Sequence, residues 1–317
     1  MLSRTADNLY WISRYIERAE TNARLLEVAA RNALLPDTGG GNRNEWDSIL
    51  SASGTKPAFD AKYGEAVQRN VETHLFFDGD NSSSVASCIR AARENGRIVR
   101  TALTTQVWEA LNTAFDDIRD LARQERSSLS TSDLVDWTLR TTALIRGAAL
   151  ATQLRNDGYD FQNIGHYLER ADSTARLLDV KYYVLLPHVS LVGSGLDNYQ
   201  WRTLLRAMNA SRAFAWVHGA DVTATKIVDF LVLNRQVPRS LISSAEGVAH
   251  HLNRLEGVYG RRTPAQERAG ELVARLDRGQ ASDIFNAGLH QFLQEILRDV
   301  GTLGATIQGT YLSGDAR

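Results

Sequence analysis

Apolar residues recur along the first thirty positions at alternating spacings of three and four, which is the pattern of a helix with one buried face. Leu9, Ile12 and Ile16 begin this series. The string LPDTGGGNRN at residues 35–44 ends it with a proline and three consecutive glycines. The pattern therefore predicts a first helix over residues 3–34.

The same periodicity predicts helices along the rest of the chain. Five prolines in 317 residues, few alternating β-branched runs and long stretches rich in Ala, Leu, Arg and Glu indicate an all-α fold. Ser132 or Asp133 is a candidate N-cap, and Pro238 suits a first helical turn. A bend is expected near Thr104 and Thr105. The further predicted helices cover residues 45–52, 61–76, 83–125, 133–155, 161–185, 199–218, 221–232, 238–259, 264–278 and 283–311.

The chain contains an internal repeat. YIERAETNARLLEV at residues 15–28 returns as YLERADSTARLLDV at residues 167–180, an offset of 152. The offset is 155 between EWDSIL at 45–50 and QWRTLL at 200–205. It reaches 156 where FFDGDNSSSV and VLNRQVPRSL each lead into the next long helix.

A period near 155 is too long for a solenoid repeat. The repeat therefore predicts a duplication that folds into one integrated domain over residues 1–317, with halves of about 1–130 and 131–317. We expect a two-lobed helical bundle in which a pseudo-two-fold axis relates the two phrases.

Each copy of the repeat keeps an adjacent Glu and Arg inside an apolar phrase. Helical spacing places Arg18 and Arg170 among Trp, Tyr and Leu neighbours, and an unpaired buried charge is costly. If the two helices pack together, Arg18 pairs with Glu169 and Arg170 pairs with Glu17. We call these four residues the Glu-Arg quartet.

Two interpretations of these charges stay open. Glu20 and Arg24, like Asp172 and Arg176, have the acidic-first order of surface salt bridges one helical turn apart, so the charges can serve stability alone. Alternatively, the quartet faces a cleft and holds a carboxylate, an amine or a phosphate.

Charge and cysteine content exclude several classes of function. The 36 basic and 37 acidic residues nearly cancel, so neither nucleic acid nor an anionic membrane is expected as a partner. The single cysteine, Cys88, rules out an internal disulfide and fits a small buried hydrophobe better than a nucleophile. No apolar run of about 18 residues and no signal-like start occur, so we expect a cytoplasmic protein.

Other polar clusters are weaker candidates. The string IRAARENGRIVR at 89–100 is typical of a solvated helix face. His250 and His251 are adjacent, so they point to different faces of a helix and make a poor metal site. No metal is predicted, and the sequence contains no phosphate-binding glycine loop, nucleophile elbow or zinc protease motif.

The string LSRTADNLYWISRYIERAETNARLLEV, echoed by NIGHYLERADSTARLLDV, resembles the Alpha-E family of bacterial all-helical proteins, named for an E-R motif. The resemblance extends over essentially the full length and includes RENGRIVR and WEALN. It implies association with circularly permuted ATP-grasp proteins and often with transglutaminase-like proteins. ATP and magnesium would then bind to the partner, with no cofactor on this chain.

The resemblance also marks individual positions. Ser13 stands where the family pattern has a glycine, and His166 where it has an arginine, so this position lacks a fixed positive charge. The implied catalytic candidates are Glu17, Arg18, Glu169 and Arg170, and the implied binding residues are Arg24, Arg176, Arg93, Glu94, Asn95 and Arg97.

Three functions compete at this point. The first is an accessory helical module that docks on an ATP-grasp amide ligase and shapes its acceptor or peptide site. The second is an enzyme acting on a peptide or amino-acid amide through the quartet, although arginine neighbours would keep its acids ionised. The third is a regulator that binds a small molecule between the lobes. An exposed apolar patch would favour docking, and a deep cleft lined by the quartet would favour catalysis.

Overall fold

The computed structural model describes residues 1–34, 45–185 and 195–313, and every regular element in these ranges is a helix. The predicted all-α fold is confirmed. Within the same ranges, no helix combines the length and the apolar character needed to cross a membrane.

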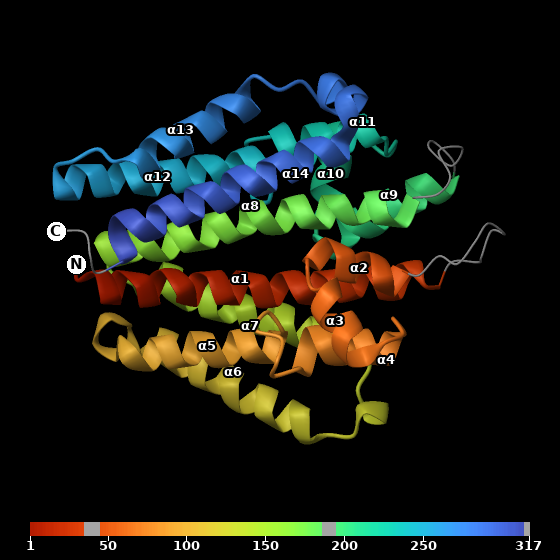
Figure 1. Cartoon of the computed structure of the whole chain (residues 1–317), viewed down its shortest axis with the longest axis horizontal. Helices are drawn as coiled ribbons and strands as arrows, with labels where there is room; N and C mark the ends of the chain where they lie inside the picture. The colour runs from red at the N-terminus through yellow and green to blue at the C-terminus, as the bar shows by residue number, and fades with distance from the viewer. Residues whose placement is uncertain (35–44, 186–194, 314–317) are drawn as a thin grey trace.

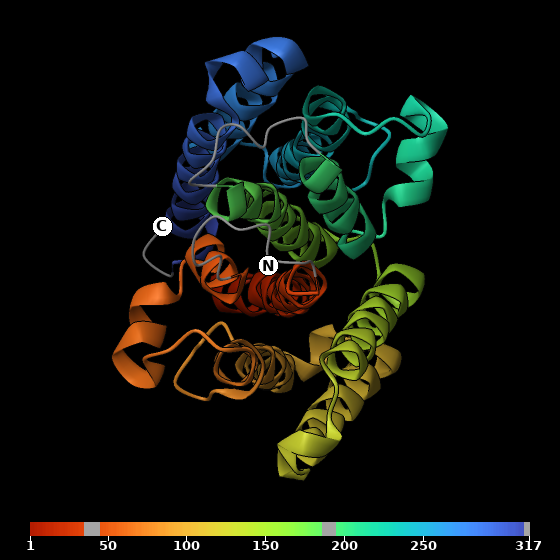
Figure 2. The same ribbon diagram turned by 90° about the vertical axis from the view of Figure 1, so that its right-hand side faces the viewer.

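Two long helices form the centre of the molecule, α1 (Ser3–Asn32) and α8 (Asp157–Leu185). They lie side by side in both ribbon views (Figures 1 and 2). They run parallel, because Arg18 of α1 contacts Glu169 of α8, and Thr21 three residues later contacts Ser173. α1 carries the repeated phrase of the first half and α8 that of the second, so the two copies meet at the midline.

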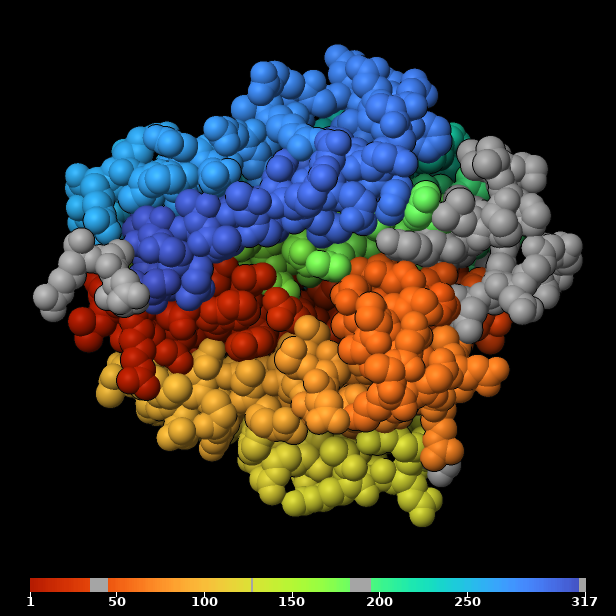
Figure 3. All heavy atoms as spheres, in the orientation of Figure 1, coloured from red at the N-terminus to blue at the C-terminus, as the bar shows by residue number. Residues whose placement is uncertain are grey.

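The remaining helices cover this central pair on two sides. α5 and α7 pack on α1, whereas α12 and α14 pack on α8, and α6 and α13 form outer layers (Figure 1). Figure 3 shows that little of α8 reaches the surface on one face of the molecule. The first group comprises α2 (Glu45–Ser53), α3 (Lys56–Tyr63), α4 (Gln68–Glu72), the π-helical turn η1 (Thr73–Phe77), α5 (Val85–Ile98), α6 (Thr105–Arg123) and α7 (Thr131–Thr152). The second comprises α9 (Gly195–Ala207), α10 (Ser211–His218), α11 (Ala224–Val228), the π-helical turn η5 (Asp229–Leu233), α12 (Leu241–Tyr259), α13 (Pro264–Asp277), α14 (Ala281–Ile307) and η6 (Gln308–Leu312).

The sequence repeat recurs in the order of the elements. α4, η1 and α5 begin at residues 68, 73 and 85, and α11, η5 and α12 begin at 224, 229 and 241, each 156 residues later. The N-caps match as well, because the side chains of Ser84 and Ser240 each accept a hydrogen bond from the backbone three residues on. The pseudo-two-fold axis and the division near residue 130 stay predictions.

Four predicted helices are interrupted, and the one predicted over 283–311 is kinked at Gly288, where φ is +108°. The helix predicted over 61–76 is broken at Gly64, whose φ of +73° places the backbone in the region that favours glycine. The helix predicted over 199–218 breaks around Asn209, which has φ of +54°. The expected bend near Thr104 is a complete break between α5 and α6, with Thr104 as the N-cap of α6.

Several predicted helix starts are wrong by a few residues, including both for which a starting residue was named. The N-cap of α7 is Ser130, which accepts a hydrogen bond from the backbone N–H of Asp133, so Ser132 and Asp133 lie inside the helix. α12 starts at Leu241 with Ser240 as its cap, and Pro238 lies before it. A side chain that accepts a hydrogen bond from a backbone N–H fixes the start of a helix. A proline is only tolerated in the first turn and does not fix it.

Gly165 sets the closest approach of the central helices. A Cβ built on Gly165 would overlap the backbone carbonyl of Tyr10, which is itself buried. The α1–α8 contact at this point therefore requires a residue without a side chain.

We expect Gly165→Ala to lower the free energy of unfolding by about 1–3 kcal/mol, because the added methyl group forces the central helices apart. Gly257→Ala is the matched control, since Gly257 is an exposed helical glycine with open space around its Cα. This control should gain about 0.5–1 kcal/mol. Urea unfolding measures both values, and equal midpoints for the two variants would contradict the close approach.

Candidate functional site

The quartet forms two reciprocal ion pairs across the midline. Arg18 donates from Nε to Glu169 Oε1 at 2.7 Å and from Nη2 to Oε2 at 3.1 Å. Arg170 donates to the two carboxylate oxygens of Glu17 at 3.1 Å each. The predicted pairing is confirmed, and both contacts have the two-pronged geometry in which a guanidinium holds a carboxylate firmly.

The two carboxylates are enclosed in protein. Glu17 is 0% exposed and Glu169 is 2% exposed. Burial raises the pKa of Glu17, but the guanidiniums of Arg170 and Arg239 outweigh it and hold that pKa well below its usual range. For Glu169, burial is likewise outweighed by Arg18 and Arg14, which lower its pKa. Both acids are therefore ionised near neutral pH.

Three further arginines complete the cluster, and the sequence interpretation missed them. Arg14 donates from Nε to Glu169 at 2.7 Å. Arg146 of α7 donates to Glu17 at 2.6 Å, and Arg239 donates to Glu17 at 3.0 Å. One signal was present, because Arg146 is the single charge in the run TTALIRGAALAT.

Guanidiniums outnumber carboxylates on both sides of the cluster. Glu169 pairs with both Arg14 and Arg18. On the other side, within the part of the chain that the structure describes, four guanidiniums contact only two carboxylates, those of Glu17 and Glu20. These four are Arg24, Arg146, Arg170 and Arg239. Burial and the neighbouring Glu17 raise the pKa of Glu20, but the arginines prevail and lower it to about 2.

His166 occupies the position in the second copy that Arg14 has in the first, at the offset of 152. Its Nδ1 lies 3.3 Å from Glu17 Oε2. Burial and the positive charge of Arg170 nevertheless lower the pKa of His166 to about 3, so the ring is neutral at physiological pH. The histidine thus adds no charge to a side that already carries an excess of arginine.

Arg24 and Arg176 each connect a central helix to the opposite half. Arg24 pairs with Glu20 and donates to the carbonyl of Ala207, at the end of α9. Arg176 pairs with Asp172 and donates to the carbonyl of Ala52, in α2, at 3.2 Å. The surface interpretation of Glu20 and Arg24 is wrong, because both side chains are buried.

The second group of predicted binding residues lies apart from the quartet on α5. Arg93 and Arg97 both pair with Glu94, the latter at 2.8 Å. Arg93 also donates to Asn112 at 3.2 Å and lies over Trp108, so its contacts are with α6. The remaining member, Asn95, is partly buried on the same helix. The structure does not bring this group to the quartet.

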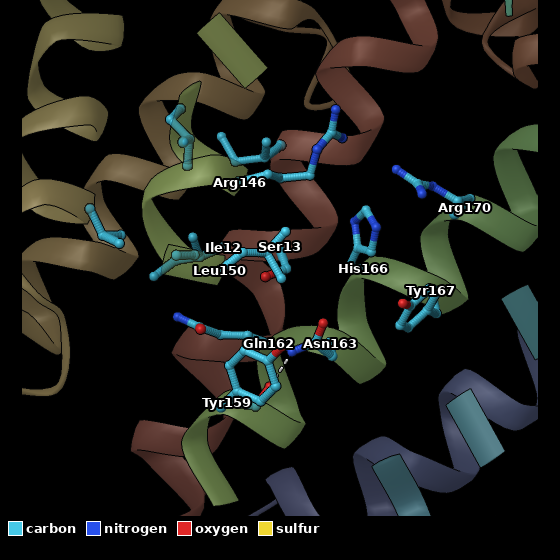
Figure 4. Close-up of a pocket in the computed structure, with 14 residues that line it drawn as sticks. Ile12, Ser13, Arg146, Leu150, Tyr159, Gln162, Asn163, His166, Tyr167 and Arg170 are labelled. Carbon is cyan, nitrogen blue, oxygen red and sulfur yellow. Dashed lines mark hydrogen bonds between the residues drawn. The ribbon is translucent and has the colours of Figure 1, made fainter. Parts of the chain in front are cut away.

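A cavity of about 230 Å³ opens beside the cluster, between α1, α7 and α8 (Figure 4). Of the quartet, only Arg170 lines it, together with Arg146 and His166. The other lining residues are Ile12, Ser13, Ile16, Val107, Ile145, Ala149, Leu150, Tyr159, Gln162, Asn163 and Tyr167. Glu17 and Glu169 are not among the residues that line it.

The site is suited to holding charge and not to transferring protons. An acid whose pKa is lowered carries no proton to donate near neutrality, and these acids are also shielded from a substrate. Burial raises the pKa of the Cys88 thiol to about 12, so it is not an activated nucleophile. Among residues 1–34, 45–185 and 195–313, no group of three or more His, Cys, Asp or Glu side chains is arranged to hold a metal ion.

Comparison with known proteins identifies the repeated motif. The model of the Alpha-E family, described as a predicted alpha-helical domain with a conserved ER motif, matches residues 1–312. Uncharacterized protein Mb2597 of Mycobacterium bovis is 23% identical over 317 residues, and Uncharacterized protein Rv2567 of Mycobacterium tuberculosis is 22% identical. Each match covers 94% of this chain and 35% of the relative, so the chain spans about a third of the length of these proteins. No solved structure matches the chain.

Glu169→Gln should destabilise the fold by about 3–5 kcal/mol, because it leaves Arg14 and Arg18 buried against an uncharged group. Glu94→Gln is the control, since Glu94 is a more exposed acid that also pairs with two arginines, and it should change stability little. Chemical denaturation with circular dichroism detects the difference. Similar losses in both variants would show that the buried pairing contributes no more than a surface salt bridge.

His166 predicts a pH dependence of stability. Its pKa is lower in the folded protein than in the unfolded chain, so its contribution is complete above about pH 6.5 and is lost as pH falls toward about 3. Between about pH 7 and pH 5 the wild type should therefore lose about 2 kcal/mol more than His166→Gln. The exposed His250→Gln variant should behave as the wild type does, and urea unfolding at both pH values measures the change. A His166→Gln profile parallel to the wild type would contradict a neutral buried ring.

Proposed function

Because the chain belongs to the Alpha-E family, we propose that it is an accessory helical module of an amide-bond-forming or peptide-modifying system in the cytoplasm. In this proposal it docks on a circularly permuted ATP-grasp protein and helps to shape that protein's acceptor or peptide site. ATP and magnesium bind to the partner, and a transglutaminase-like protein is a second candidate partner.

The observation that carries this proposal is an exposed apolar surface on α7. We define the α7 apolar surface as Ala143, Leu144, Gly147, Leu150, Ala151 and Leu154, the last just beyond the helix, all of which are exposed. Leu144 is 59% exposed and Leu154 is 74% exposed.

The position of this surface suits a docking site. α7 lies at the edge of the molecule (Figure 2). Arg140 and Arg155 bound the α7 apolar surface, while the one charged residue between them, Arg146, turns inward to Glu17. An apolar centre with a charged rim is the usual arrangement of a protein interface.

The curated relatives add independent support. The matched segment makes up 35% of each mycobacterial protein, so in those proteins the domain is joined to a longer stretch of other chain. A module that works beside another protein is consistent with this arrangement.

The arrangement of the quartet favours docking over catalysis by this chain. Its carboxylates are enclosed and ionised, and neither of them lines the cavity. A carboxylate held in this way fixes how the two central helices pair, and its oxygens are already engaged by guanidiniums.

Replacing two exposed leucines tests the docking surface. Leu144→Glu and Leu154→Glu should each weaken binding to a circularly permuted ATP-grasp protein by about tenfold or more, because a charge is buried on complex formation. They should also reduce the partner's coupling of ATP turnover to amide product, followed by product mass. Both positions are exposed, so the fold should be retained.

Val258→Glu on α12 is the matched control, because Val258 is 58% exposed and lies outside the α7 apolar surface. It should bind and couple as the wild type does. Wild-type affinity for Leu144→Glu and Leu154→Glu would exclude docking through α7.

A further inference from the structure

The cavity beside the cluster has three chemically different walls. Arg146, His166 and Arg170 gather at one end, and Gln162, Asn163 and Tyr159 lie toward the other (Figure 4). The third wall is apolar, with contributions from α1, α6 and α7 that include Ile12, Val107, Ile145 and Leu150. This cavity therefore has a cationic end, an end that carries amide groups and an apolar side. No side chain of the described residues fills it.

At the cationic end, guanidiniums outnumber carboxylates among the residues that the structure describes. Arg146 and Arg170 belong to the group of four guanidiniums that, within these residues, contact only Glu17 and Glu20. Each guanidinium has five N–H donors, and Arg146 uses its two terminal nitrogens for these acids. An anion entering the cavity would meet remaining donors and bring the local charge closer to balance.

Gln162 provides an amide group on the cavity wall. Its side chain is in a residue only 5% exposed, it lines the cavity, and its Oε1 has no hydrogen-bond partner among the described residues. Buried amide groups are nearly always satisfied, because an unmade hydrogen bond is costly. Because this Oε1 is closed off from the cavity, a ligand with its own amide would instead accept a hydrogen bond from the side-chain NH₂ of Gln162.

We propose that the cavity binds a small organic carboxylate of the N-acyl amino acid or dipeptide type. Its carboxylate contacts Arg146 and Arg170, its amide contacts Gln162, and its apolar side chain lies against Ile145 and Leu150. The inference does not depend on docking through α7, since it concerns the chain by itself.

Helix geometry and volume fit a ligand of this size. Gln162, His166 and Arg170 follow one another at intervals of one turn on α8, so the amide and cationic ends lie about 6–12 Å apart along the helix. Two extended residues span about 7 Å. The volume of about 230 Å³ equals that of about eight water molecules.

Inorganic phosphate fits the same cavity less well. Arginine binds phosphate and carboxylate equally readily, so the cationic end alone does not discriminate. Phosphate has neither an amide for Gln162 nor an apolar part for Ile12 and Ile145. The chemistry of the other two walls therefore favours the carboxylate.

Isothermal titration of the full chain with N-acetyl-L-leucine tests the proposal. N-acetyl-L-leucinamide, which lacks the charge, is the matched ligand and should bind about tenfold more weakly or worse. Inorganic phosphate should also bind more weakly than the acid. No binding of the acid, equal binding of acid and amide, or tighter binding of phosphate would each overturn the proposal.

Two variants locate the ligand. Leu150→Glu places a negative charge at an exposed position on the cavity wall and should weaken binding of the acid about tenfold. Gln162→Leu should weaken binding of N-acetyl-L-leucine severalfold and leave binding of 4-methylpentanoate, which has no amide, unchanged. Val258→Glu is the control and should bind as the wild type does. Wild-type affinity of both cavity variants for the acid would exclude this site and leave docking on α7 to its own test.

Discussion

The structure depends on neutralising two carboxylates that are buried where its central helices meet. Glu17 and Glu169 lose almost all contact with water, so each needs guanidinium partners from the opposite helix. Those partners fix how α1 lies along α8, because a shift of one residue would separate charge from countercharge. Close packing at Gly165 and Tyr10 then depends on the same register. The outer helices pack around α1 and α8, whose relative position the ion pairs set.

The sequence predicts this centre because two local signals agree there. The repeated phrase indicates two similar helices. The Glu-Arg pair within it predicts that each helix supplies the arginine that neutralises the other helix's glutamate. Arg239 could not be placed from sequence, since it reaches Glu17 from a segment more than 200 positions away. The breaks near Gly64 and Asn209 were also missed, because single residues with positive φ end a helix whose apolar pattern continues. Helix existence follows from periodicity, whereas helix ends and long-range partners follow from tertiary contacts.

The two copies of the repeat differ at two positions next to the cavity. Ser13 and Gly165 are equivalent positions in the repeat, as are Arg14 and His166. At Gly165 the helices close on Tyr10, whereas at Ser13 the corresponding space is part of the cavity. Replacement of an arginine by a neutral histidine on that side leaves a smaller side chain beside the excess guanidiniums. Gly165 and Tyr10 thus form a closed contact, whereas Ser13 and His166 both line a polar opening of the size of a small ligand.

The reciprocal reach of Arg24 and Arg176 has a consequence for how the two halves depend on each other. Each binds a carbonyl in the half to which it does not belong, Ala207 for one and Ala52 for the other. A chain with one copy of the unit could make such a contact only with a second molecule of itself, through a self-complementary interface. A single-copy version of this unit would thus need to pair as a symmetric homodimer to keep both contacts, whereas one continuous chain lets each side change separately.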